Sequence, residues 1–195
     1  MDQPPALSPA QRAELLSIAR RALEERVRGK SLSPVVPADV ALSAPGAAFV
    51  TLTEADMLRG CIGYVQPIAP LGEMVARCAA AAASEDPRFV PVAEDELADL
   101  QIEISVLSPL AALSDVHQLT VGVHGVCVSH GGRRGLLLPQ VASERGWDAE
   151  TFLRHTCLKA GLPANQWREG ADIQVFTVDH FSEHRPPEAA QSERE

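Results

Sequence analysis

Aromatic side chains and positive charge are both scarce in this chain. Only 4% of its 195 residues are aromatic, and 17 Lys and Arg residues stand against 26 Asp and Glu residues, a formal net charge of −9. Nucleic acids and anionic membrane surfaces require a basic footprint, and single-stranded nucleic acid also uses aromatic stacking. The composition therefore argues against a nucleic-acid partner, with the adjacent Arg133 and Arg134 and the basic positions of the first helix as local exceptions.

Long apolar runs are also missing. No stretch reaches the roughly 18 consecutive apolar residues of a membrane-spanning helix. The first five residues, Met-Asp-Gln-Pro-Pro, do not form the basic start of a secretory signal. We therefore expect no membrane association and a cytoplasmic location.

The cysteines form no recognisable pair or cluster. The four of them are Cys61, Cys78, Cys127 and Cys157, and none belongs to a C-x-x-C pair or a zinc-finger pattern. In a reducing compartment they are expected to be thiols. His124 and His130 would hold a metal only with a third ligand from elsewhere, and the alternative is a solvated hairpin. The chain also lacks the common nucleotide-binding, zinc-protease and serine-hydrolase motifs, so we expect neither a metal nor a cofactor.

Hydrophobic spacing and turn signals do predict secondary structure. Helices are expected at about 8–28, 70–84 and 149–160, an extended connector at 31–45 and a glycine-rich hairpin loop at 129–135. Strands are expected within 47–65, 97–107, 119–128, 136–138 and 172–181. Short hairpins without regular strand-helix alternation predict an α+β fold with a mixed or largely antiparallel sheet. We expect one domain over residues 8–183, with flexible termini at 1–7 and 184–195.

The segment Leu58 to Gly63, which reads Leu-Arg-Gly-Cys-Ile-Gly, is the first candidate site. On a regular strand Arg59 and Cys61 would share a face, where the guanidinium would favour the thiolate and lower the pKa of the thiol. Gly60 and Gly63 would let a ligand or another backbone come close. The alternative is that Cys61 is a small buried side chain and Arg59 an ordinary surface or paired arginine.

A second candidate follows the predicted helix at 70–84. Arg88 could bind a carboxylate or phosphate through its guanidinium fork, with Asp86 nearby as an acid. Equally, Asp86 and Arg88 could form an internal pair within a turn. The sequence leaves both alternatives open.

The motif at 58–63 closely resembles the signature of the AMMECR-type domain family, whose prokaryotic members are called AmmeMemoRadiSam system protein A. The resemblance continues in order and spacing through segments 86–89, 104–108, 135–141, 147–148 and 157–162 and Trp167. It spans about residues 12–183. It implies an α+β fold with a larger and a smaller lobe packed as one unit, and a cleft between them near the 58–63 motif.

This resemblance implies a pathway but no activity. The family name reflects genomic company with a Memo-like protein and a radical S-adenosylmethionine enzyme. This chain lacks the cysteine run that would hold an iron–sulfur cluster. We therefore expect an accessory component that binds a ligand or a partner, with Arg59, Gly60, Gly63 and Arg88 as binding residues. The alternative is an enzyme with thiol chemistry at Cys61, assisted by Arg59, on a small anionic substrate. Whether the chain is an enzyme stays open, because no general base can be placed beside Cys61.

Overall fold

The structure is a computed structural model that describes residues 7–183, and it divides into two compact units. The large unit comprises residues 7–105 with 180–183, and the small unit comprises residues 106–179. Each unit contains a four-stranded sheet and helices, so the α+β class is confirmed. Apart from Leu7, the termini predicted to be flexible lie outside the described residues.

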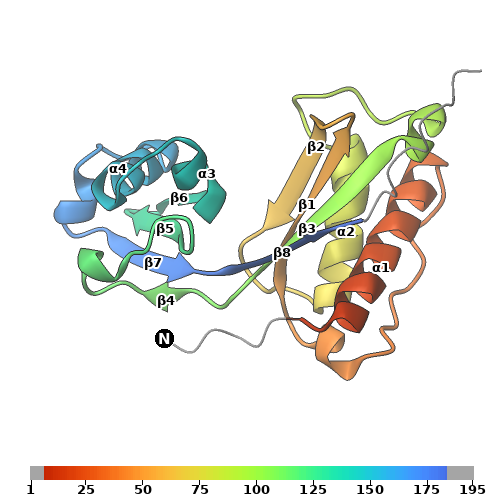
Figure 1. Cartoon of the computed structure of the whole chain (residues 1–195), viewed down its shortest axis with the longest axis horizontal. Helices are drawn as coiled ribbons and strands as arrows, with labels where there is room; N and C mark the ends of the chain where they lie inside the picture. Colours follow the sequence, from red (N-terminus) through yellow and green to blue (C-terminus); the bar gives the residue numbers. More distant parts are fainter. Residues whose placement is uncertain (1–6, 184–195) are drawn as a thin grey trace, which may run out of the picture. The chain divides into compact units, whose positions relative to one another are not determined.

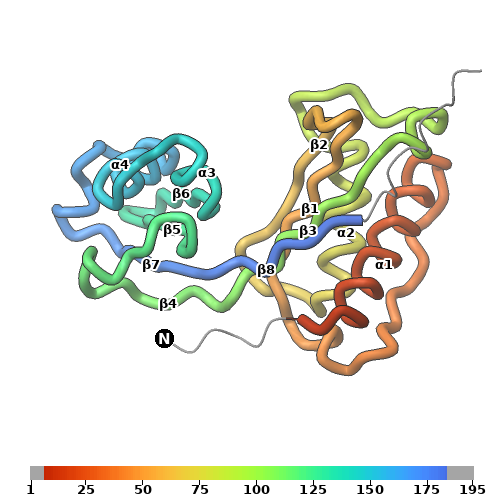
Figure 2. Tube along the Cα trace, viewed as in Figure 1, coloured from red at the N-terminus to blue at the C-terminus, as the bar shows by residue number. Residues whose placement is uncertain are grey.

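The large unit is built on a sheet with the strand order β2-β1-β3-β8. The sheet consists of β1 (Ala47–Glu54), β2 (Met57–Tyr64), β3 (Leu100–Leu107) and β8 (Val178–Ser182), of which residues 106–107 and 178–179 are assigned to the small unit. The helices of the large unit are α1 (Pro9–Val27) and α2 (Leu71–Ser84). Helix α2 packs against β1 and β2, and α1 packs against α2 (Figure 1). Although β3 and β8 are far apart in sequence, they lie side by side (Figure 2).

The first helix begins where the sequence predicts. Ser8 Oγ accepts a hydrogen bond from the Gln11 amide at 3.2 Å, and Gln11 Oε1 accepts one from the Ser8 amide at 2.8 Å. These two bonds form a capping box, which satisfies amides that the helix itself leaves unbonded. The helix buries its apolar side chains Leu15, Ile18, Ala19, Ala22 and Leu23.

Strands β1 and β2, which form where strands are expected within 47–65, pair as a hairpin that contains an irregularity. Its turn uses Ala55 and Asp56, both at positive φ, as a tight hairpin turn requires. The strands pair antiparallel with Thr51 opposite Cys61, and the register then shifts so that Arg59 has no partner on β1. This shift has the character of a β-bulge, which interrupts the alternation of side chains along β2.

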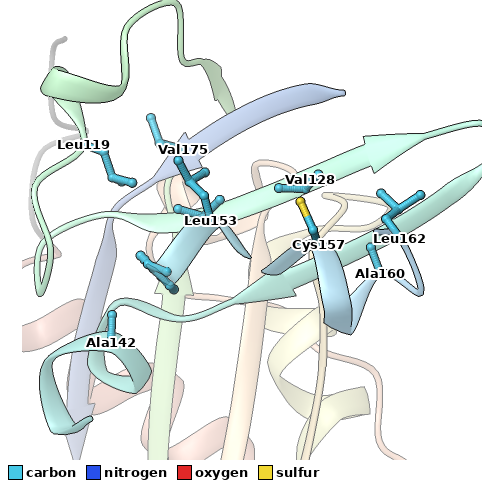
Figure 3. Close-up of a cluster of buried hydrophobic side chains, with 10 residues drawn as sticks. Leu119, Val128, Ala142, Leu153, Cys157, Ala160, Leu162 and Val175 are labelled. Atoms are coloured by element: carbon cyan, nitrogen blue, oxygen red, sulfur yellow. The ribbon is translucent and has the colours of Figure 1, made fainter. Parts of the chain in front are cut away.

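The small unit carries a second sheet with the order β4-β7-β5-β6. Its elements are β4 (Ala111–Ala112), β5 (Gly125–His130), β6 (Arg133–Leu137), α3 (Pro139–Glu144), α4 (Ala149–Lys159) and β7 (Asp172–Phe176). Val128 of β5 and Val175 of β7 pack with Leu153 and Cys157 of α4 in its hydrophobic core (Figure 3). Short 3-10 helices complete the described chain at Val40–Ser43, Glu94–Ala98, Val116–Gln118 and Gln166–Arg168.

Two predicted strands differ from the structure for local reasons. The strand expected to begin at 119 begins at Gly125, because the Thr120 carbonyl accepts hydrogen bonds from the Val123 and His124 amides and closes a turn. The single strand expected at 172–181 is interrupted at Thr177, whose amide and carbonyl both bond Ser108. Its two parts, β7 and β8, belong to different sheets, which an apolar pattern along the chain does not reveal.

Further differences are smaller. Helix α3 and strand β4 were not predicted, and the expected connector at 31–45 contains the 3-10 helix at Val40–Ser43. The loop expected at 129–135 narrows to Gly131 and Gly132, both at positive φ. Within residues 7–183, no helix has both the length and the apolar character needed to cross a membrane.

Candidate functional site

Cys61 lies on β2, an edge strand of the large unit's sheet. Its neighbour Gly60 faces α2, because a Cβ atom there would collide with the carbonyl oxygen of Ala82. Cys61 therefore faces away from α2. There Thr51 Oγ1 donates a hydrogen bond to Cys61 Sγ at 3.3 Å. The partly exposed thiol is thus held by the residue opposite it on β1.

Asp86 connects β2 to the segment that follows α2. Its Oδ2 atom accepts a hydrogen bond from the Cys61 amide at 2.8 Å, which satisfies a backbone group at the edge of the sheet. Its side chain is only 2% exposed. Hydrogen bonds from the Arg88 side chain, and then from the amides of Cys61 and Arg88, lower the pKa of this carboxyl well below its ordinary value, against the opposing effect of burial. Asp86 is therefore charged at neutral pH.

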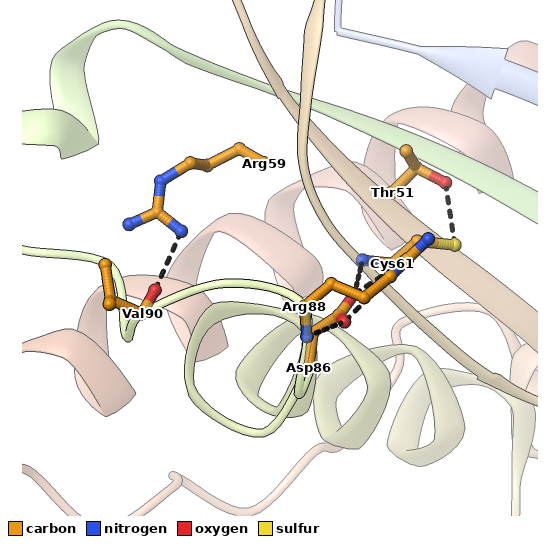
Figure 4. A network of polar contacts seen from close by, with 6 residues as sticks. All are labelled: Thr51, Arg59, Cys61, Asp86, Arg88 and Val90. Atoms are coloured by element: carbon orange, nitrogen blue, oxygen red, sulfur yellow. Dashed lines mark hydrogen bonds and ion pairs between the residues drawn. The ribbon is translucent and has the colours of Figure 1, made fainter.

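Arg88 is the cation at this site. Its Nε donates to Asp86 Oδ1 at 2.9 Å and its Nη2 donates to Asp86 Oδ2 at 2.7 Å, while the guanidinium also lies over the Phe89 ring. The side chain is still 54% exposed. The pKa of Arg88 is raised first by the hydrogen bonds to Asp86, with smaller electrostatic contributions from Asp86 and Cys61. Figure 4 shows Arg88 in front of Cys61. The internal Asp86–Arg88 pair, one of the two alternatives, is present.

Arg59 makes its contacts elsewhere. Its Nε and Nη2 donate to the Glu96 carboxylate at 2.6 and 2.9 Å, and its Nη1 donates to the carbonyl of Val90 at 2.9 Å. In Figure 4 its side chain extends toward Val90, whereas Cys61 Sγ is turned toward Thr51. The Glu96 hydrogen bonds raise the pKa of Arg59 and lower that of Glu96. The bulge at Arg59 removes the regular alternation on which its predicted place beside Cys61 rested.

Packing accounts for both glycines of the motif. Gly60 lets the backbone of α2 approach β2 at Ala82, which is one of the two roles the sequence suggested. Gly63 lies opposite Phe49 on β1, and the Phe49 ring occupies the space that a Cβ atom would need. A role for either glycine in binding a ligand stays a prediction.

The other three cysteines are buried. Burial raises the pKa of Cys78 to about 12, and burial also raises the pKa of Cys157. Cys127 Sγ accepts a hydrogen bond from Arg134 Nε at 3.0 Å. Cys61 is thus the only one of the four with appreciable exposure, and all four lie within the described residues.

The histidines and arginines near the β5–β6 hairpin have local partners. His124 Nδ1 accepts from the Thr120 amide at 3.0 Å, and His130 Nδ1 lies 3.3 Å from the Gly170 carbonyl oxygen. Arg133 donates to the Gly161 carbonyl at 2.6 Å. Within residues 7–183, no three His, Cys, Asp or Glu side chains gather as a potential metal site.

Two residues of the site were not identified from the sequence. Thr51 is found only when the hairpin register is known, because a one-residue shift would place it on the other face. Glu96 gives no local signal, since it reaches Arg59 from 37 residues along the chain. Asp86 and Arg88 were found because they stand together in the sequence.

Comparison with known proteins agrees with this fold. The AMMECR1 family profile matches residues 16–181. A protein of Methanothermobacter thermautotrophicus is 49% identical over 158 residues, 76% of this chain and 81% of its own length, and one of Aeropyrum pernix is 43% identical over 195 residues, 94% and 84%. The crystal structure of the uncharacterized protein PH0010 from Pyrococcus horikoshii is 40% identical, covers 88% of this chain and 91% of its own, and has a TM-score of 0.81. The chain therefore belongs to the AMMECR1 family.

Proposed function

We propose that this chain is a binding component, and that the surface formed by Arg88 and Cys61 receives an anionic group of a small ligand or a partner protein. The observation that carries the proposal is the double role of Asp86, which holds the Arg88 fork and the Cys61 amide at once. A guanidinium fixed in this way loses little side-chain entropy when it binds a second group.

The remaining donors of Arg88 suit an anion. The pair with Asp86 uses Nε and one hydrogen of Nη2, and a guanidinium has five N–H donors in all. Three donors are therefore directed away from Asp86, on a side chain that is 54% exposed. Carboxylates and phosphates match this planar donor pattern.

The partners we propose are those that the family resemblance implies, a Memo-like protein and a radical S-adenosylmethionine enzyme. This chain would act beside them as an accessory component. The absence of any base among the contacts of Cys61, within the described residues, favours binding over catalysis at the thiol.

The test is co-purification of the tagged chain with these two proteins from the same genome. Wild type and Cys61→Ala should recover similar amounts of the partner. With Arg88→Gln, the amount of partner recovered should fall at least tenfold. Arg77→Gln is the matched control, because Arg77 pairs with Glu73 on the exposed surface of the same unit. Equal recovery with Arg88→Gln and wild type would contradict a binding role for Arg88.

A direct measurement tests the anion itself. Inorganic phosphate should shift the Cys61 amide resonance in a saturable way, and Arg88→Gln should abolish the saturation. A shift that stays the same in Arg88→Gln would assign anion binding to another part of the chain.

The second candidate function is thiol chemistry at Cys61 on a small anionic substrate. It is favoured by the exposure of this one cysteine and by its contact with the Thr51 hydroxyl. Iodoacetamide should then label Cys61 rapidly in the folded protein, and Cys78, which is fully buried, is the internal control. If both cysteines label at the same slow rate, thiol chemistry is excluded.

A further inference from the structure

Ser105, His180 and Glu103 form a polar cluster that the Cys61 site does not use. The distance from Ser105 Oγ to His180 Nδ1 is 3.4 Å, and the distance from His180 Nε2 to Glu103 Oε2 is also 3.4 Å. Glu103 and Ser105 lie on β3, and His180 lies on the neighbouring strand β8. All three residues belong to the large unit.

The cluster lies on the face of the sheet that is turned away from α2. Ile102 and Ile104 of β3 are fully buried, as are Val50 and Leu52 of β1. Since side chains alternate along a strand, Glu103 and Ser105 lie on the opposite face. Cys61 and Thr51 lie on this same face. Three strand intervals separate β2 from β8, which carries His180, about 14 Å in all, so His180 cannot serve Cys61 as a base.

The hydrogen-bonding capacity of the three groups sets the proton positions. Glu103 Oε2 lies 3.4 Å from His180 Nε2 and can only accept, so this contact favours the tautomer that carries its hydrogen on Nε2. In a neutral imidazole the other nitrogen, Nδ1, is then an acceptor, and it faces the Ser105 hydroxyl. A serine hydroxyl, an imidazole and a carboxylate are therefore linked in the order that activates a serine nucleophile.

We propose that Ser105 is a second reactive centre of this protein, a nucleophile toward small acyl esters, with His180 as its base and Glu103 as the group that orients His180. The proposal does not rest on the binding function of Arg88. It assigns a role to the segment 104–108, which belongs to the family resemblance but makes no contact in the Cys61 site.

The chemistry balances without a cofactor. Ser105 Oγ forms a bond to the acyl carbon, its proton passes to His180 Nδ1, and the leaving alcohol takes that proton as its ester bond breaks. A water molecule then attacks the acyl carbon and gives a proton to His180. The bond from the acyl carbon to the Ser105 oxygen breaks, and this oxygen takes the proton back from His180. The sum is an ester and water converted to an acid and an alcohol.

Exposure limits the substrate. Ser105 is only 4% exposed, while half of the His180 side chain and a third of the Glu103 side chain are accessible. A small acyl group approaching past His180 fits this arrangement better than a bulky one.

The experiment uses the full chain and a small alkyl fluorophosphonate. Its phosphorus forms a bond to an activated serine oxygen as fluoride leaves and the proton passes to the base. Intact mass should show one label per chain, located at Ser105 by peptide mapping. Ser105→Ala should take no label, and Ser182→Ala, which removes an exposed hydroxyl on β8, should label like wild type.

Two variants test the roles of the other residues. His180→Asn should label about 100-fold more slowly, in the range that a general base contributes, and Glu103→Gln at least tenfold more slowly. These rates keep the proposal testable even if Ser105→Ala does not fold. Failure of wild type to label, labelling of another residue, or a wild-type rate in His180→Asn would each overturn it. Arg77→Gln, in an exposed pair on α2 outside both sites, should label normally. Partner recovery and phosphate binding do not involve Ser105, so they separate this outcome from the binding function.

Discussion

The carboxylate of Asp86 holds the guanidinium of Arg88 with both of its oxygens, at 2.9 and 2.7 Å. One of those oxygens also accepts the Cys61 amide. A buried carboxylate needs such donors to compensate for its lost hydration, and these hydrogen bonds are strongest while the carboxylate is charged. Asp86 thereby links the segment after α2 to the edge strand β2, as Arg59 also does through Val90 and Glu96.

The first prediction is that Asp86→Asn destabilises the protein by about 1.5–3 kcal/mol at pH 7, the range for hydrogen bonds to charged groups. Because the folded pKa of Asp86 is depressed, its contribution is complete above the ordinary value of 3.8 and is lost as pH falls through the lower folded value. The free energies of unfolding of wild type and Asp86→Asn, measured with urea between pH 7 and pH 2, should therefore approach each other as the pH falls. Glu73→Gln, in an exposed pair on α2, should change little at any pH.

The second prediction concerns the close approach of β2 and α2. Gly60→Ala should lower the free energy of unfolding by about 1–3 kcal/mol. The new methyl group would collide with the backbone oxygen of Ala82, and a backbone cannot rotate away as a side chain can. Gly131→Ala is the comparison, because a Cβ atom at Gly131 would meet open space and only the positive φ opposes the substitution. Its free energy of unfolding should fall by about 1 kcal/mol. Thermal unfolding measures both. A smaller loss for Gly60 than for Gly131 would contradict the packing role.

The third prediction separates Arg59 from Arg88. Arg59→Lys keeps the charge but cannot form the fork to Glu96 or reach the Val90 carbonyl in the same geometry. We expect faster amide hydrogen exchange in residues 90–96, with the Cys61 amide unchanged because its acceptor is Asp86. Glu96→Gln should reproduce the effect more weakly. Faster exchange at the Cys61 amide instead would show that Arg59 supports the hydrogen bond between Cys61 and Asp86.

The fourth prediction tests the core of the small unit. Phe152 on α4 is fully buried, so Phe152→Ala should destabilise the protein by about 3–5 kcal/mol. Leu158 lies on the same helix and is 53% exposed. The free energy of unfolding of Leu158→Ala should therefore lie within about 0.5 kcal/mol of the wild-type value. Chemical denaturation measures both, and equal losses would mean that the two positions are packed alike.

Local signals in the sequence were enough for much of the secondary structure. The capping residues Ser8 and Gln11, the apolar stripe of α2 and the alternation in β3 act within a few residues, and their elements form where they predict. The family assignment rested on motifs of the same local kind, and the match over residues 16–181 confirms it.

Long-range relationships needed the tertiary structure. The single apolar pattern at 172–181 is divided between two sheets, because strand pairing depends on partners far along the chain and not on the pattern itself. In the same way Glu96 takes Arg59 as its partner from 37 residues away.

Local patterns in the sequence were sufficient for the α+β class, for the family and for singling out Cys61 among the four cysteines. Which cation lies near Cys61 depends on the fold. A bulge of one residue interrupts the alternation of β2, and Arg59 pairs with Glu96. Arg88 reaches the neighbourhood of Cys61 because Asp86 binds both. Side-chain direction along a strand is set by pairing with the next strand, and that pairing is a property of the fold.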